Sequence, residues 1–412
     1  MMRYLIICLA AILLPLCSVA QPTPWNAALN QASRDLNFIS EDGEFEVQLS
    51  GSVDMRTYYF AQRPVGFVFT RPDASSNTQY SPRLTLNLDA FYGERLYGFV
   101  KFRWDDGVDP GYMNNSVRLD EIFLRGTVIM NKLDLQVGRF ATVFGNWAGR
   151  HGAWESPFIT APLPYDQATS VTDNAAPPNA TAFANRANVP INKHTWAPVI
   201  WGSVYTEGVA AFGSYEDFTL ALTGTNRPLS SRPPTWDDRD FDTTPTFTGR
   251  LGWTPHAKWG FGVSGMIGPY FINSAASTLP AGSNINDFNQ ITIGGDLSFA
   301  HGPWQVWAEF IYNRFEVPNV GNADSYSYYI EGKYKISTNF FTALRWGQQF
   351  YNKVDTPAGP AEWDSDVLRT DAAFGIRFDQ HTQLKLQYTY QHQDASFQDG
   401  TQQVAAEATI RF

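Results

Sequence analysis

The sequence predicts an all-β fold, a transmembrane antiparallel β-barrel of about 16 strands with a long third outer loop. Three observations lead to this prediction: an amino-terminal secretory signal, apolar–polar alternation with a period of two residues, and connections of two length classes. Alternation places apolar and polar side chains on opposite faces of a strand. In lipid, the backbone groups of such strands must all pair with neighbouring strands, so the strands can span a membrane only as a closed barrel.

Residues 1–20 have the three parts of a secretory signal peptide. A basic head is followed by an apolar run and by a small-residue cleavage site that ends at Ala20. The run is shorter than the roughly 20 apolar residues of a membrane helix, so we expect cleavage near Ala20. Both cysteines, Cys8 and Cys17, lie in this segment, so the mature chain is expected to have no thiol.

The alternation is clearest at the end of the chain, where every second residue from Val404 to Phe412 is apolar. About sixteen such segments can be counted, and an even number is what a closed bacterial barrel requires. The segments are predicted to begin near Glu44, Tyr80, Arg95, Ser116, Lys132, Ser203, Asp217, Pro245, Lys258, Asp287, Pro303, Ser325, Asn339, Val367, Thr382 and Thr401.

The connections alternate between tight turns and longer loops, as periplasmic turns and outer loops do in such barrels. Trp253, Trp259 and Trp304 lie near strand ends, where aromatic residues form girdles at the two membrane interfaces. A soluble sandwich or solenoid also alternates, but it explains neither the signal peptide nor the two loop classes. We therefore expect the barrel over residues 44–412, preceded by a periplasmic segment at 21–43.

The composition narrows the range of partners. The formal net charge is −10, which argues against nucleic acid because phosphate binding requires a basic face. No glycine-rich phosphate loop, zinc-ligand spacing or dinucleotide motif is present, so no cofactor and no metal site is expected. Acidic runs at 237–242 and 364–366 do not match the spacing of a calcium loop, and solvated loop charges are the simpler interpretation.

The fourth predicted strand changes phase. Val117 and Leu119 share one face, whereas Ile122 and Leu124 have the opposite parity. A β-bulge near Asp120 would explain this change, because one extra residue shifts the alternation of the strand.

Several motifs resemble those of bacterial porins, and most of all those of the phosphate-selective porin family and its relatives. They are the runs from Arg118 to Arg125, from Leu133 to Phe140 and from Val143 to Gly145, together with the terminal Phe412. That family has a similar Val-Gly-basic-Phe run and an aromatic-Gly pair that leads into a long loop. The sequence differs in having Val143 where a proline is expected, and it has no dense lysine cluster that would predict phosphate as the solute.

The resemblance implies an outer-membrane porin of a Gram-negative-type bacterium. It would give passive diffusion of small hydrophilic solutes or ions through a water-filled barrel. It further implies a homotrimer in contact with outer-membrane lipid and lipopolysaccharide. The barrel-assembly machinery would read Phe412 as an assembly signal.

The longest connection covers residues 142–202, far above the usual length of a loop. It is the third outer loop in order, and in porins this loop folds into the lumen, so we expect it to form the constriction. The alternative is an outer cap or a clasp between subunits. The constriction residues expected in it are Trp147, Trp154, Glu155, Phe158, Tyr165, Asp166 and Asp173.

Basic residues occupy inward positions of several predicted strands. The expected pore-lining residues are Arg83, Lys101, Arg103, Arg118, Arg125, Arg345, Arg369 and Arg377. Acidic residues of the long loop could face the basic residues of strands two to four across the pore. The two groups would then set up a transverse electric field that sorts solutes by charge and dipole. Alternatively, the inward charges solvate the lumen and pair with inward acids.

Two other functions remain open, and a third is not expected. Loop aromatics such as Trp147 and Tyr165 suit a sugar-preferring channel with an aromatic track. A non-conducting structural or adhesin barrel would need a lumen plugged by 142–202 or 21–43. A catalytic barrel is not expected, because His151 and Ser156 lie in an unpatterned loop and do not form a nucleophile arrangement.

Overall fold

The computed structural model describes residues 24–62, 66–69, 77–105, 116–188, 196–232, 244–394 and 400–412. The expected signal peptide and the acidic run at 237–242 lie outside these ranges. None of the helices in the described ranges is both long and apolar enough to span a membrane.

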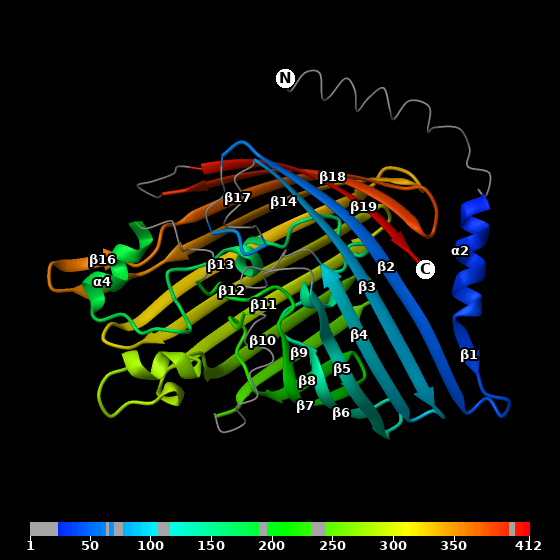
Figure 1. Cartoon of the computed structure of the whole chain (residues 1–412), viewed down its shortest axis with the longest axis horizontal. Helices are drawn as coiled ribbons and strands as arrows, with labels where there is room; N and C mark the ends of the chain where they lie inside the picture. Colours follow the sequence, from blue (N-terminus) through cyan, green and yellow to red (C-terminus); the bar gives the residue numbers. More distant parts are fainter. Residues whose placement is uncertain are drawn as a thin grey trace.

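The described residues form a closed antiparallel β-barrel (Figure 1). Its sheet has 17 strands, of which one is a short ladder beside the ring, so that 17 − 1 = 16 strands form the ring. The ring strands are β2 (Phe45–Phe60), β3 (Thr78–Tyr92), β4 (Leu96–Asp105), β5 (Ser116–Ile129), β6 (Leu133–Ala141), β7 (Tyr205–Tyr215), β8 (Phe218–Thr225), β9 (Thr246–His256), β10 (Trp259–Pro269), β11 (Asn289–His301), β12 (Trp304–Val317), β13 (Gly321–Lys335), β14 (Phe340–Tyr351), β17 (Val367–Arg377), β18 (Thr382–Gln393) and β19 (Gly400–Arg411).

Each ring strand pairs with the next along the chain, and β19 pairs with β2 to close the ring. The fold prediction is therefore confirmed, and every predicted strand begins within four residues of an observed one. The remaining elements are α2 (Pro24–Asp35), β1 (Asn37–Ile39), η2 (Ala148–Arg150), α3 (Leu163–Asp166), α4 (Ala180–Ala184), η3 (Asn185–Asn188), η6 (Asn273–Thr278), η7 (Ile285–Asp287), β15 (Lys353–Thr356) and β16 (Gly359–Glu362).

The two ends of the barrel differ. At one end the strands are joined by turns of two to four residues, and we call it the tight-turn end. The other, the long-loop end, carries eight connections, L1 to L8 in chain order, of which L3 is the longest. These are 61–77, 106–115, 142–204, 226–245, 270–288, 318–320, 352–366 and 394–399. The carboxyl terminus and α2 lie at the tight-turn end, and β15, β16 and α4 at the opposite end (Figure 1).

The two faces of the wall have opposite character. In β19, Gln403, Glu407 and Thr409 are buried on the inner face, whereas Val404 is exposed on the outer face. Large rings are exposed on the outer surface at two levels, with Trp253, Trp259 and Trp304 near the tight-turn end and Tyr59, Tyr80 and Phe350 near the long-loop end. The wall thus has an apolar outer surface bordered by aromatic residues, as a membrane barrel requires.

The expected bulge is present in β5. Lys101 of β4 pairs with Glu121, and the next residue, Phe102, pairs with Leu119, so Asp120 has no partner of its own. The extra residue brings Arg118 and Arg125 to the same inner face although they are seven positions apart.

The amino-terminal segment closes against the tight-turn end. β1 pairs with the start of β2, where Phe38 lies opposite Val47. Asn30 of α2 bonds to Gln380 and His381 in the turn between β17 and β18, with 2.9 Å between the Asn30 and His381 side chains. The helix therefore lies beside the mouth of the barrel, next to the carboxyl terminus (Figure 1).

Candidate functional site

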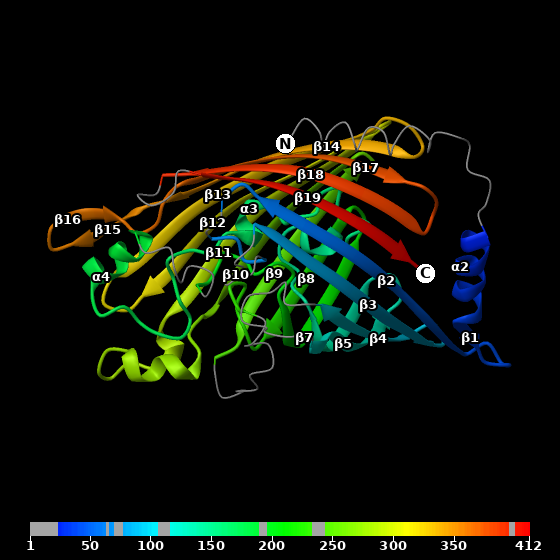
Figure 2. The same cartoon turned by 45° about the horizontal axis from the view of Figure 1, so that its top comes forward.

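The site is built from L3, which enters the ring and packs on its inner wall. Figure 2 shows the α3 segment of L3 inside the ring. Glu309 of β12 is the main anchor: its carboxylate accepts hydrogen bonds from the Asn146 N–H (2.5 Å), the Trp147 N–H (2.9 Å) and the Tyr165 hydroxyl (2.5 Å). Gly145 makes this turn at φ +69°, and a Cβ there would lie 2.6 Å from the Tyr165 hydroxyl oxygen. Only glycine fits both requirements.

Two apolar clusters join L3 to the wall. The inner cluster contains Val68, Phe144, Trp147, Ala161, Tyr165, Val199, Ile200, Trp201, Val204, Tyr205, Leu229, Met266, Ile311 and Tyr329. The outer cluster, towards the long-loop end, is built around Phe183, Phe271 and Trp363, with the rings of Phe183 and Trp363 stacked 5.7 Å apart. L3 therefore fills much of the interior, and the space that remains lies along its free side.

Polar contacts fix L3 to the wall of β12 to β18. Arg345 donates to the Thr160 carbonyl (3.1 Å), and Lys385 donates to the Ala153 carbonyl (2.7 Å). Arg369 forms a buried ion pair with Asp166 (2.8 Å). The basic residues of this wall hold the loop through its backbone and its acids.

The basic residues predicted on β3 to β5 do face the interior, and most of them form ion pairs with carboxylates of the same or a neighbouring strand. Within this group the ion pairs are Arg83–Asp105 (3.5 Å), Arg103–Asp105 (2.9 Å), Arg103–Asp120 (3.3 Å), Arg118–Asp120 (2.7 Å) and Lys101–Glu121 (3.3 Å). Arg125 donates instead to the Gln136 amide oxygen (2.7 Å). On the opposite wall, Arg345 pairs with Asp371 (2.8 Å), and Arg377 donates to the Gln383 amide oxygen (2.8 Å).

Two acidic residues of L3 share cavities with the β3 to β5 group: Asp166 lines one with Arg83 and Arg103, and Glu155 lines a second with Lys101. The transverse-field hypothesis stays a prediction. Asp166 pairs with Arg369, and Asp173 pairs with Arg232 of L4 (2.7 Å). Glu155 is exposed. Because L3 leans on the β12 to β18 wall, Asp166 and Asp173 form their ion pairs with cations of that wall and of L4.

Two adjoining cavities run along the free side of L3. The larger, the vestibule, measures about 610 Å³ and opens near the tight-turn end, where Asn30, Gln380 and Phe412 line it. The smaller, the chamber, measures about 80 Å³. Both are lined by Arg83, Arg103, His151 and Tyr205, so the chamber adjoins the inner end of the vestibule.

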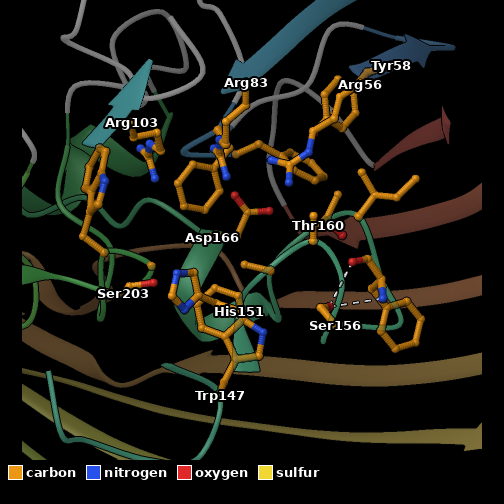
Figure 3. A pocket seen from close by; sticks show the side chains of 18 of the residues that line it. Arg56, Tyr58, Arg83, Arg103, Trp147, His151, Ser156, Thr160, Asp166 and Ser203 are labelled. Carbon is orange, nitrogen blue, oxygen red and sulfur yellow. Dashed lines mark hydrogen bonds between the residues drawn. The ribbon is translucent and has the colours of Figure 1, made fainter. Parts of the chain in front are cut away.

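The chamber has two unlike sides (Figure 3). Arg56, Arg83 and Arg103 line the strand side, one from each of β2, β3 and β4. L3 lines the other side with Trp147, His151, Phe158, Asp166 and Trp201. The chamber thus lies between a row of guanidinium groups and a mostly aromatic loop surface.

His151 is held as a neutral ring in this surface. Its Nδ1 lies 2.5 Å from the Ala148 carbonyl, and its Nε2 lies 3.1 Å from the Tyr205 hydroxyl. Burial and then the nearby Lys101 charge lower the pKa of His151 to about 3. The Ser156 hydroxyl donates to the Phe158 carbonyl (2.9 Å). His151 and Ser156 therefore form their hydrogen bonds with other groups and not with each other.

The aromatic residues expected to form a track are mostly anchors. Trp147, Phe158 and Tyr165 are buried, and Phe158 lies under the Arg345 guanidinium, 4.3 Å from it. Trp154 lies near the tight-turn end, where Arg411 covers its ring at 3.9 Å. These side chains pack on protein groups, while Trp147 and Phe158 also line the chamber and Trp154 the vestibule.

A different set of rings faces the interior, and we call it the wall patch. It consists of Phe91, Tyr97, Phe99, Phe123 and Phe212. Phe91 stacks on Tyr97 (4.9 Å), and Arg125 lies over Phe212 at 4.6 Å. This patch was not predicted from the sequence, although the inward parity of Lys101, extended back along β4, leads to Phe99 and Tyr97.

Phe412 lies at the seam of the ring. Its N–H donates to the Gly51 carbonyl (3.0 Å), and its own carbonyl accepts from the Gly51 N–H (3.1 Å). A Cβ on Gly51 would lie 2.9 Å from the Phe412 ring, so the last residue packs closely on β2. Its expected role as an assembly signal stays a prediction.

No group of three His, Cys, Asp or Glu side chains able to hold a metal occurs in the described part of the chain.

The buried Asp166–Arg369 pair gives a pH-dependent prediction. Burial raises the pKa of the Asp166 carboxyl to about 6, and the Arg369 charge only partly opposes this. A folded-state pKa above that of the unfolded chain, about 3.9, means that ionising Asp166 costs folding free energy. Its contribution to stability is therefore complete below about pH 4 and is lost as the pH rises through about 6.

Urea unfolding of the protein and of Asp166→Asn in detergent, at low and neutral pH, measures this effect. The asparagine variant keeps a neutral side chain at every pH. The parent should therefore lose stability relative to the variant as the pH rises. A stability difference that stays constant with pH would contradict the prediction.

No protein-family model and no curated protein matches the sequence. Solved structures are similar to it in fold. The outer membrane channel DcaP of Acinetobacter baumannii is 14% identical with a TM-score of 0.58, over 91% of this chain and 99% of that one. OmpF of Salmonella typhi, in a complex with daunomycin, is 10% identical with a TM-score of 0.57, over 91% and 100%. An anion-selective porin from Comamonas acidovorans is 12% identical with a TM-score of 0.56, over 90% and 100%. The fold is therefore porin-like, and the comparison does not single out the phosphate-selective family.

Proposed function

We propose that this protein is an outer-membrane porin through which small hydrophilic solutes or ions diffuse passively. The observation that carries the proposal is the narrow chamber between the arginine row and L3, which adjoins a vestibule of about 610 Å³. A sixteen-strand barrel is wide enough for an aqueous channel unless its own loops fill it. L3 fills one side only, so the chamber becomes the constriction and the vestibule its exit.

The proposal also assigns an orientation and partners. The tight-turn end faces the periplasm and the long loops face outwards, since porins have short periplasmic turns. The apolar outer wall contacts outer-membrane lipid and lipopolysaccharide. A homotrimer, delivery by a cleaved signal peptide and insertion by the barrel-assembly machinery belong to the same proposal, in which the protein catalyses no reaction.

Recording from planar bilayers tests the proposal directly. The purified protein should insert in discrete current steps, with a current that rises in proportion to voltage. A folded, heat-modifiable protein that gives no steps would favour the non-conducting structural barrel, in which the apolar clusters of L3 act as a plug.

The wall patch supports a second candidate, a channel that prefers sugars. The rings of Phe99 and Phe123 lie 5.4 Å apart on the inner wall, and aromatic faces of this kind stack on the apolar faces of sugars. Current block by maltose or sucrose that is lost in Phe99→Ala would support this candidate. Equal block in both proteins would contradict it.

The membrane-facing surface gives a depth-dependent prediction. Ile330 is half exposed on the outer face and pairs with Ala308 and Trp346 at mid-strand. Ile330→Arg should lower the unfolding free energy in phospholipid vesicles by about 2–4 kcal/mol, because arginine is costly at the bilayer midplane. Ile336→Arg, in an exposed turn, is the matched control and should cost about 0–1 kcal/mol. Equal costs would mean that Ile330 does not face lipid.

A further inference from the structure

Most inward-facing lysines and arginines of the ring have a carboxylate partner. A small group, Lys333, Lys335 and Arg377, has none among the described residues. Among the described residues, no carboxylate oxygen lies within 4.0 Å of the side-chain nitrogens of Lys333, Lys335 or Arg377. In contrast, Arg83 and Arg103 at the chamber and the neighbouring Arg118 each form an ion pair with Asp105 or Asp120. The three cations that have no acid beside them therefore lie near the tight-turn end and not at the chamber.

The three cations share one stretch of inner wall. Lys333 and Lys335 alternate with outward residues on β13, and Arg377 ends β17, with β14 between them. The ring of Phe341, from β14, lies between the two sides: Lys333 Nζ is 4.6 Å from its centre and the Arg377 guanidinium 5.9 Å. Cations so placed are stabilised by the ring face. Arg377 is also held by the Gln383 amide oxygen (2.8 Å) and the Trp154 carbonyl (2.6 Å), to which it donates hydrogen bonds.

The Phe341 ring packs against the wall at Gly375. A Cβ at Gly375 would lie 2.0 Å from Phe341, so only glycine leaves room for the ring. Phe341 is buried and forms a fixed floor between the cations.

A cavity of about 440 Å³ opens over this floor. Lys333, Lys335 and Arg377 line it together with the polar side chains of Gln305 and Asn339, and no aspartate or glutamate is among its lining residues. Its volume is within the range of small-molecule sites, roughly 300–1,000 Å³.

We propose that this cavity is an anion-binding site that holds the carboxylate or phosphate group of a small solute before its release from the barrel. The inference rests on the proposed function and names the charge of the solute. Unbalanced cations in a concave, partly enclosed site attract anions far more strongly than arginines already paired with acids. The ligand is a solute and not a lipid headgroup, because all three cations face the interior.

Binding is measured with inorganic phosphate as the probe, by phosphorus NMR line broadening on the detergent-solubilised protein. Lys333→Gln/Lys335→Gln should weaken phosphate binding by about tenfold, or 1.4 kcal/mol. The matched control is Lys132→Gln/Lys258→Gln, which removes two lysines from exposed turns at the same end. It should bind like the parent. Heat-modifiable migration on a gel shows that each variant is folded.

Equal binding by the lysine variant and the parent would overturn the proposal, as would an equal loss in the control. The same proteins in a bilayer under a salt gradient give a second readout, in which the lysine variant should shift the reversal potential towards cation preference. Phosphate binding does not require current. A protein that binds phosphate but passes no current would therefore contradict the porin proposal and still support the anion-binding site.

Discussion

Replacing residues 156–186 of L3 by a flexible Gly/Ser linker is expected to raise the single-channel conductance several-fold. The segment carries Phe158, Tyr165 and Asp166, which join the loop to the wall, and Phe158 and Asp166 also border the chamber. Without it, the passage would widen towards the bore of the ring, and sixteen-strand barrels leave an aqueous channel of that size. Single-channel recording in planar bilayers measures the change.

A Gly/Ser replacement of 280–284 in L5 is the control, because that segment lies at the long-loop end and does not line the chamber. It should leave the conductance as it is. If the L3 replacement folds and its conductance stays at the parent value, the loop does not limit the current and the constriction hypothesis is wrong.

Glu407→Ala is expected to cause the largest loss of stability of any substitution considered. Glu407 lies on β19 between Arg56 of β2 and Lys385 of β18, directly opposite both in the strand register. It pairs with Lys385 (2.6 Å) and with Arg56, and all three side chains are buried. Removing the carboxylate leaves Lys385 with no acid partner and Arg56 with only Asp54 at 3.9 Å, which should cost about 3–5 kcal/mol.

Urea unfolding in vesicles measures the loss, and Glu362→Gln is the control. Glu362 pairs with Lys353 at 3.8 Å on the exposed β15–β16 hairpin, where ion pairs contribute little, about 0–1 kcal/mol. A loss at Glu407 no greater than that at Glu362 would mean that the seam does not depend on this triad.

The ring could be predicted because its signal is local. A half-buried strand repeats every two residues, so the strand starts and even the bulge at Asp120 follow from parity alone. The same rule predicts that Arg83 and Lys101 face inwards, and they do. Loop lengths are also local, so the position of L3 between β6 and β7 follows from the count of strands.

The contacts inside the ring could not be predicted, because they join residues far apart in the chain. Asp166 meets Arg369 across 203 positions, and Glu309 meets Asn146 across 163. Parity shows that a side chain points inwards and does not show which inward partner it reaches. The aromatic residues of L3 illustrate this: a surface track and a buried anchor have the same composition, and only the path of the loop decides between them.

Chemical block of the chamber tests the central claim most directly. Ser203 lines the chamber (Figure 3), and the mature chain is expected to have no other thiol, so Ser203→Cys places one reactive group in the constriction. A charged methanethiosulfonate reagent should reduce the single-channel current of Ser203→Cys and leave that of Ser337→Cys, in an exposed turn, unchanged. Full labelling of Ser203→Cys with no change in current would show that ions do not pass between L3 and the arginine row.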